Sequence, residues 1–143
     1  MSHALSAYLG YLKGKTYIYE TMQDFDIRFV AIKALLQSAL ALSVENKVEI
    51  NSLLSHADNL LYRFTNVALE DTVERLGKDT KLKLGGNDRL VGALKLAEKH
   101  GLDANYICIG IAAGMFFEPK ADESSVELCS FAKENGVAKT LEF

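Results

Sequence analysis

The chain has 143 residues, of which 49% are hydrophobic and 24% are charged, and its formal net charge is −3 at pH 7. This size and balance are typical of one packed globular domain and exclude an intrinsically disordered chain. The acidic balance provides no concentrated positive field for nucleic acid or for an anionic membrane surface. We therefore expect a single domain over residues 1–143 with no nucleic-acid partner and no membrane partner.

Targeting and cysteine signals indicate the cytoplasm. The first residues, Met1 to Ala4, lack the basic start and apolar core of a secretory signal peptide. Glycine, serine or charge interrupts every apolar stretch before it reaches the ~20 residues of a membrane span. Cys108 and Cys129 lack the spacing of a metal site or a redox pair. We therefore expect both to be buried free thiols in a reducing compartment.

Helix is predicted for most of the first half of the chain. Residues 2–13 carry apolar side chains at three- and four-residue spacing, with Gly14 as the stop, and a short helix or turn follows at 16–23. Asp24 can cap the next helix, whose apolar stripe runs to residue 42, and the pattern repeats over 48–64. These last two helices are expected to form an antiparallel core pair.

The second half begins with a change of character. A brief helical signal at 70–76 is followed by a lysine-rich run and Gly85-Gly86, which together predict a basic, glycine-flanked loop. Further helices are predicted at 88–100, 105–117 and 122–135, followed by a short helical tail, with Gly110 and Gly114 permitting close helix packing. The predicted fold class is all-α, a single bundle of about seven to nine helices.

Positive charge clusters in one stretch of this otherwise acidic chain. The five basic residues of this stretch are Arg75, Lys78, Lys81, Lys83 and Arg89. Arginine can bind phosphate or carboxylate through paired hydrogen bonds, and lysine adds a mobile charge, so the stretch could hold a small anionic ligand. The alternative is a solvated loop whose basic residues pair with neighbouring carboxylates.

The remaining polar residues give weaker signals. His3 lies on the polar edge of the first helix, where a lone histidine is more often a surface or capping residue than a catalytic one. His56 and His100 lack zinc-ligand neighbours. Gly85-Gly86 is too short for a phosphate-cradling loop and follows no predicted strand. The residues themselves therefore predict neither a metal site nor a nucleotide site.

Three parts of the chain carry distinctive segments: His-Ala-Leu-Ser-Ala-Tyr-Leu-Gly at 3–10, Arg-Phe-Thr-Asn at 63–66 with Asp71 and Glu74-Arg75-Leu76-Gly77 after it, and Lys83-Leu84 with Asp88-Arg89-Leu90. Together they resemble the C-terminal domain of the polyol-specific long-chain mannitol dehydrogenases. The glycine-containing helix at 110–114 also fits. The resemblance spans nearly the whole chain and keeps the order and spacing of that domain.

The resemblance implies an NAD-dependent oxidoreductase of two domains. Its helical C-terminal domain would bind the sugar phosphate, and an N-terminal Rossmann domain, absent from this chain, would bind NAD. The implied reaction is reversible hydride transfer between D-mannitol 1-phosphate and D-fructose 6-phosphate, without a catalytic metal. We expect this chain alone to be inactive.

The resemblance also implies roles for three residues. The catalytic signature of the family is a lysine, then an asparagine and then a histidine along one helix; His3 matches the histidine, and the other two would precede Met1. The general base is therefore expected to be missing, and His3 is expected to hold or orient the developing alkoxide. Arg75 and Lys83 match the basic positions that contact the far end of the polyol, where they would bind phosphate.

Other matching positions are expected to be structural first. Asn66, Asp88 and Arg89 are expected to fasten the basic loop to the bundle. The chain departs from the family at Val67 and Ala93, where proline is usual, and around Lys81, where arginine is usual. These departures make the loop geometry and the sugar preference less secure.

Two further interpretations compete with the dehydrogenase. One is a non-catalytic, stand-alone helical binding module that uses its first helix as an interface. The other is a helical DNA-binding domain, which is disfavoured because no recognition helix has a basic face.

The dehydrogenase interpretation also makes a prediction about assembly. Tyr8 and Tyr11 of the first helix would be exposed by the missing domain and could drive homodimerisation.

Overall fold

The computed structural model describes residues 1–140, which fold into nine α-helices and one 3₁₀ turn. The helices are α1 (Ser2–Leu12), α2 (Ile18–Gln23), α3 (Phe25–Asn46), α4 (Ile50–Phe64), α5 (Val73–Gly77), α6 (Thr80–Lys83), α7 (Arg89–Lys99), α8 (Asn105–Met115) and α9 (Glu123–Thr140), with the 3₁₀ turn at Val67–Leu69. Within the described residues, strand pairing is limited to an isolated bridge between Tyr17 and Thr72. The all-α prediction is therefore confirmed.

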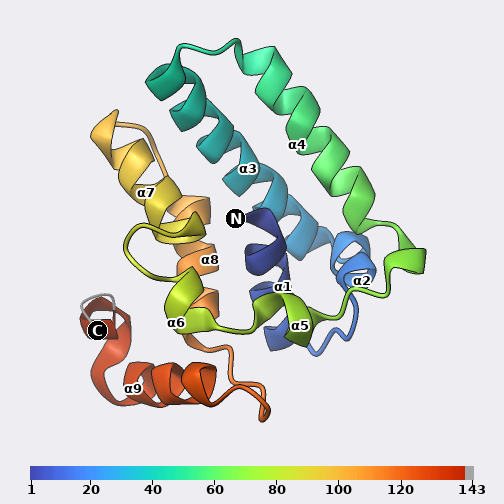
Figure 1. The fold of residues 1–143 in the computed structure, drawn as a ribbon, viewed down its shortest axis with the longest axis vertical. Coiled ribbons are helices and arrows are strands. Elements are labelled where there is room, and N and C mark those ends of the chain that lie inside the picture. Colours follow the sequence, from blue (N-terminus) through green and yellow to red (C-terminus); the bar gives the residue numbers. More distant parts are fainter. Residues whose placement is uncertain (141–143) are drawn as a thin grey trace.

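Helix α1 lies at the centre of the bundle (Figure 1). It packs most extensively on α5 and α8, and its Leu5 and Tyr8 side chains are fully buried. A Cβ atom on Gly110 or Gly114 of α8 would lie 2.6 Å from Leu5 Cδ1 or 2.7 Å from Tyr8 Cε2, respectively. The glycines therefore let α8 approach α1 closely, as the sequence predicted.

Helices α3 and α4 form an antiparallel hairpin at one side of the molecule (Figure 1). Asp24 caps α3 as predicted, accepting hydrogen bonds from the backbone N–H groups of Asp26 and Ile27. Helix α3 packs on α1, α4, α7 and α8, whereas α4 packs mainly on α3 and buries only Ala57 and Phe64. The prediction of a core pair is therefore right for α3 and wrong for α4. Helices α1 and α8 form the core with α3, in the place expected for α4.

Helix α3 is more apolar than the sequence analysis allowed. It has 22 residues and contains an 18-residue window with a mean hydropathy of 1.6, so its length and composition are sufficient to cross a membrane. Core helices of globular proteins meet the same criterion, and α3 packs against helices on several sides in this bundle. The expectation that every apolar stretch is interrupted early was therefore wrong for this helix.

The predicted basic loop contains a short helix. Helix α6 forms at Thr80–Lys83, in the middle of the lysine-rich run. It packs against α9, which runs along the lower edge of the view in Figure 1. Gly136 interrupts α9 with a φ of 81°, so the predicted stop is confirmed, and residues 141–143 of the predicted tail lie outside the described residues.

Three side chains occupy environments that differ from their predictions. Cys129 is buried as expected, but Cys108 is exposed because it lies on the outward face of α8. Tyr8 is fully buried and its ring contacts Phe117, and Tyr11 is half-buried against the same ring. Tyr8 therefore cannot contribute to an exposed dimer surface, because α5 and α8 already cover α1.

Candidate functional site

His3 lies in the first turn of α1 and packs against the end of α4. Its imidazole lies over the ring of Phe64, with 3.9 Å between the ring centroids and 31° between the planes. Burial, followed by the positive charges of the Met1 ammonium and Arg63, lowers the pKa of His3 to about 4. At neutral pH the side chain is a neutral imidazole with one donor and one acceptor nitrogen, rather than the surface or capping residue expected from its position on the helix.

The amino group of Met1 lies at the start of α1 and interacts electrostatically with His3 and with residues that follow α5 in the chain. Burial and then the charge of Arg89 lower the pKa of this amino group, and Asp88 and Lys83 also act on it. Figure 1 shows this end of the chain in the middle of the molecule, beside α1 and α3. Positive charges from separate parts of the sequence therefore act on the start of α1.

Lys83 reaches this region from the end of α6. Its ammonium nitrogen, Nζ, donates a hydrogen bond to the carbonyl oxygen of Leu76 at 2.7 Å. Burial is the largest cause that lowers the pKa of Lys83, followed by the charge of Arg89, while Asp79 opposes both. Lys83 and His3 make direct contacts with different groups, the carbonyl oxygen of Leu76 and the ring of Phe64, and what they share is an electrostatic interaction with the Met1 amino group.

Arg75 is placed differently. Its guanidinium binds the carboxylate of Asp71, one turn away, and its side chain is 60% exposed. It borders a depression of about 410 Å³ together with Thr72, Glu74, Lys78, Asp79, Pro119, Ala121 and Asp122. Within the described residues, the ion pair of Arg75 is therefore with Asp71 and not with a group beside His3, which is the surface pairing weighed as an alternative for the basic stretch.

The matching polar residues have structural contacts. Asn66 accepts a hydrogen bond from the backbone N–H of Ala68 at 3.0 Å and caps the 3₁₀ turn. Asp88 caps α7 and lies 3.7 Å from the guanidinium Nε of Arg89. Arg89 has a second role, because its charge acts on both the Met1 amino group and Lys83.

Two neighbours of His3 received no role in the sequence analysis. Phe64 supplies the ring under the imidazole, and Arg63 contributes a positive charge. Both belong to the Arg-Phe-Thr-Asn segment that carries part of the family resemblance. Their function was missed because only the folded chain places the end of α4 against the start of α1.

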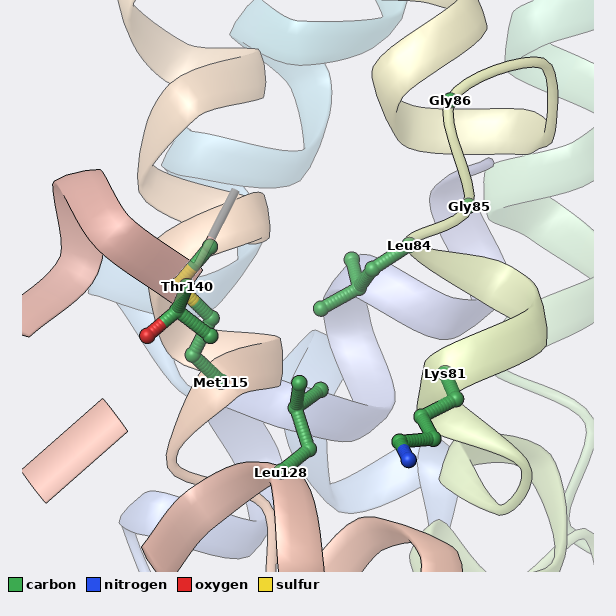
Figure 2. A pocket seen from close by; sticks show the side chains of 7 residues that line it. All are labelled: Lys81, Leu84, Gly85, Gly86, Met115, Leu128 and Thr140. Atoms are coloured by element: carbon green, nitrogen blue, oxygen red, sulfur yellow. The ribbon is translucent and has the colours of Figure 1, made fainter. Parts of the chain in front are cut away.

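A separate cavity lies between α6, α8 and α9 (Figure 2). It measures about 310 Å³ and is lined by Lys81, Leu84, Gly85, Gly86, Met115, Leu128 and Thr140. Figure 2 shows the side chains of Leu84, Met115 and Leu128 pointing toward one another, with the Lys81 ammonium at the edge. Lys81 also forms an ion pair with Glu127 of α9 at 2.9 Å. Lys83 instead binds the carbonyl oxygen of Leu76 in α5.

The described residues contain no cluster of three or more His, Cys, Asp or Glu side chains that could hold a metal ion. They also contain no strand followed by a glycine-rich turn and a helix, the unit that binds a dinucleotide phosphate. What the region around His3 offers is a neutral imidazole, an aromatic wall and several cationic groups. Such a site suits a polar ligand that carries negative charge at one end.

The fold defines an all-α helical domain, and comparison with known proteins identifies its family. The family model described as mannitol dehydrogenase C-terminal domain matches residues 1–139. The chain therefore belongs to the mannitol dehydrogenase C-terminal domain family, in agreement with the resemblance found in the sequence.

Several curated relatives carry the name mannitol-1-phosphate 5-dehydrogenase. The chain is 39% identical over 140 residues to the one from Thermoanaerobacter pseudethanolicus, and the match covers 98% of this chain and 36% of the relative. It is 37% identical over 140 residues to those from Caldanaerobacter subterraneus subsp. tengcongensis and Clostridium acetobutylicum, with the same coverage. The chain thus spans about a third of the length of these relatives.

Proposed function

We propose that this chain is the substrate-binding domain of an NAD-dependent mannitol-1-phosphate 5-dehydrogenase. The reaction would be reversible hydride transfer between D-mannitol 1-phosphate and D-fructose 6-phosphate. The observation that carries the proposal is the family match over residues 1–139, together with relatives of that name at up to 39% identity. Because the chain covers 36% of those relatives, the proposed enzyme includes an N-terminal Rossmann domain that this chain lacks.

The chemistry assigned to His3 follows from its neutral state. Oxidation of a secondary alcohol creates negative charge on the alcohol oxygen, and a positioned N–H donor stabilises that charge. His3 can donate from one nitrogen because its pKa is about 4, and Phe64 fixes the plane of the ring. His3 is therefore proposed to hold the reacting oxygen, while the general base is a group outside this chain.

The cationic side chains are proposed to bind the phosphate. The charge of Arg89 acts directly on Lys83, so a phosphate bound between them would meet both charges. Arg75 is proposed as a weaker contributor, because binding a phosphate would first require its ion pair with Asp71 to open. NAD would supply the hydride acceptor and is proposed to bind mainly to the N-terminal domain, since residues 1–140 contain no dinucleotide-binding unit.

The cellular setting is part of the same proposal. We place the enzyme in the cytoplasm as a soluble protein without a catalytic metal and without a nucleic-acid or membrane partner. A homodimer is also proposed, although not through Tyr8, because that side chain is fully buried.

An NADH oxidation assay with fructose 6-phosphate tests the proposal. It should be run on this chain and on the protein encoded when the reading frame is continued upstream of Met1. Activity in the longer protein alone supports a substrate-binding domain that needs its partner domain. If the longer frame is absent or its product is inert with fructose 6-phosphate and related sugars, the alternative of a non-catalytic binding module is favoured.

A matched pair of substitutions in the longer protein tests the site. We expect Lys83→Gln to raise KM for fructose 6-phosphate about tenfold, the equivalent of about 1.4 kcal/mol. We expect Arg75→Gln to have a smaller effect, because Arg75 is already paired with Asp71. Steady-state kinetics will distinguish them, and a larger effect for Arg75→Gln would contradict this assignment.

A further inference from the structure

Helix α6 is too short to be stable by itself. It has four residues, and a single helical turn fixes more backbone freedom than its hydrogen bonds repay. The turn before it is also unusual, since Asp79 has a φ of 61°, in the left-handed region that non-glycine residues rarely adopt. The position of Lys83 therefore depends on whatever holds this turn in place.

The start of α9 holds α6 through a buried polar network. The carboxylate of Asp122 accepts a hydrogen bond from the backbone N–H of Asp79 at 2.7 Å. Ser125 accepts one from the backbone N–H of Thr80 at 3.3 Å and another from the Thr80 hydroxyl, and it donates its own hydroxyl to Asp122. Thr80 and Ser125 are both fully buried. The free N–H groups at the start of α6 are thus satisfied from another helix.

From these contacts, and on the basis of the proposed function, we propose that Ser125 and Asp122 are positioning residues that fix Lys83 at the sugar-phosphate site. The network reaches Lys83 through α6, with Thr80 at its first position and Lys83 at its last. The other end of the lysine is fixed by the carbonyl oxygen of Leu76. Loss of the network would free α6 and let the lysine enter solvent.

The pKa of Lys83 provides a readout of its position that needs no ligand. Burial is the main cause that lowers this pKa, and the charged groups that act on the lysine are Arg89, Asp79, Lys78, Asp122 and the Met1 amino group. Removing the Ser125 hydroxyl changes none of these charges directly. A rise in the pKa of Lys83 in Ser125→Ala therefore reports release from the buried position.

The test uses the 143-residue chain with ¹³C-labelled lysine, and Lys83→Arg identifies the signal. We expect Ser125→Ala to raise the pKa of Lys83 toward its ordinary value, and Thr80→Val, which removes the other hydroxyl, to do the same. Ser124→Ala is the matched control, because Ser124 donates to Asp122 at 2.9 Å from within α9 and does not bridge to α6. If Ser125→Ala misfolds, the pKa of Lys83 in Thr80→Val tests the proposal instead. A Lys83 pKa that stays at the wild-type value in the folded variants would overturn the proposal.

Titration with fructose 6-phosphate separates this proposal from the proposed function. We expect Ser125→Ala to weaken binding about tenfold and Ser124→Ala to leave it unchanged. If the wild-type chain and the longer protein both fail to bind fructose 6-phosphate while the pKa of Lys83 still responds to Ser125→Ala, the sugar assignment fails and the anchoring of Lys83 stands. If fructose 6-phosphate binds equally to wild type and Ser125→Ala, the positioning role is wrong.

Discussion

The contact between α1 and α8 and the anchoring of α6 hold two parts of the molecule by different means. Gly110 and Gly114 let α8 lie close against Leu5 and Tyr8, so this contact depends on shape and apolar burial. Helix α6 is instead held by hydrogen bonds that its first backbone N–H groups donate to Asp122 and Ser125. Apolar packing thus builds the scaffold, while a few directional hydrogen bonds hold α6 in place.

The sharpest test of the packed region is a methyl group added to Gly110. Its Cβ would lie 2.6 Å from Leu5 Cδ1, and Leu5 is fully buried, so we expect Gly110→Ala to lose about 2 kcal/mol of unfolding free energy. Gly92→Ala is the control, because its Cβ would meet only Asn87 backbone at 3.4 Å, and it should gain up to about 1 kcal/mol. Urea denaturation measures the unfolding free energy of both variants. Equal values for Gly110→Ala and Gly92→Ala would show that the contact between α1 and α8 does not depend on close packing.

A second test asks whether side-chain hydrogen bonds also stabilise a helix of the packed core. At the N-terminus of α8, Asp103 accepts a hydrogen bond from the backbone N–H of Asn105 at 3.1 Å. Gln37 of α3 accepts from the next two backbone N–H groups, those of Tyr106 and Ile107, at 3.1 and 3.3 Å. We expect Gln37→Ala to cost about 1–2 kcal/mol in urea denaturation, the usual effect of losing a cap. The same change at Gln23, exposed at the end of α2, should stay within about 0.5 kcal/mol. Similar losses at both positions would argue against the cap.

The pH dependence of stability tests the environment of His3. Its folded pKa of about 4 lies below the ordinary histidine value of 6.5, so the unfolded chain binds the proton first. The stability is complete above pH 6.5 and is lost as the pH falls toward about 4, with a cost of about 1–2 kcal/mol after allowance for solvent screening. His3→Gln should flatten this slope, as measured by urea midpoints across that range. Parallel slopes for the two proteins would contradict a half-buried, neutral imidazole.

The smallest effect is expected at an exposed ion pair. Lys133 lies 2.7 Å from Glu118, but both side chains are largely in solvent, at 52% and 40% exposure. Lys133→Gln should therefore leave Tm within experimental error, because water and salt screen such pairs. A clear loss of Tm in calorimetry would mean that polar contacts at the surface of α9 matter more than the comparison allows.

Local sequence patterns predicted where the helices begin and end better than they predicted which helices pack together. The Asp24 cap, the Gly136 stop and the glycines of α8 were all visible in the sequence, because caps and helix spacing depend on near neighbours. The short helix α6 was predicted as loop, since α9 supplies the bonds that stabilise it. The exposure of Cys108 was also missed, because an apolar helix does not reveal which of its faces will be covered.

The candidate site divides in the same way. The sequence determined the fold class, the family resemblance and the identities of His3, Arg75 and Lys83, because these follow from residue type and spacing along the chain. Only the tertiary structure decided that Phe64 lies under His3, that Arg75 is held by Asp71 and that Lys83 binds the carbonyl oxygen of Leu76. The physical reason is that burial and electrostatic environment arise from contacts between segments distant in sequence, which no local pattern encodes.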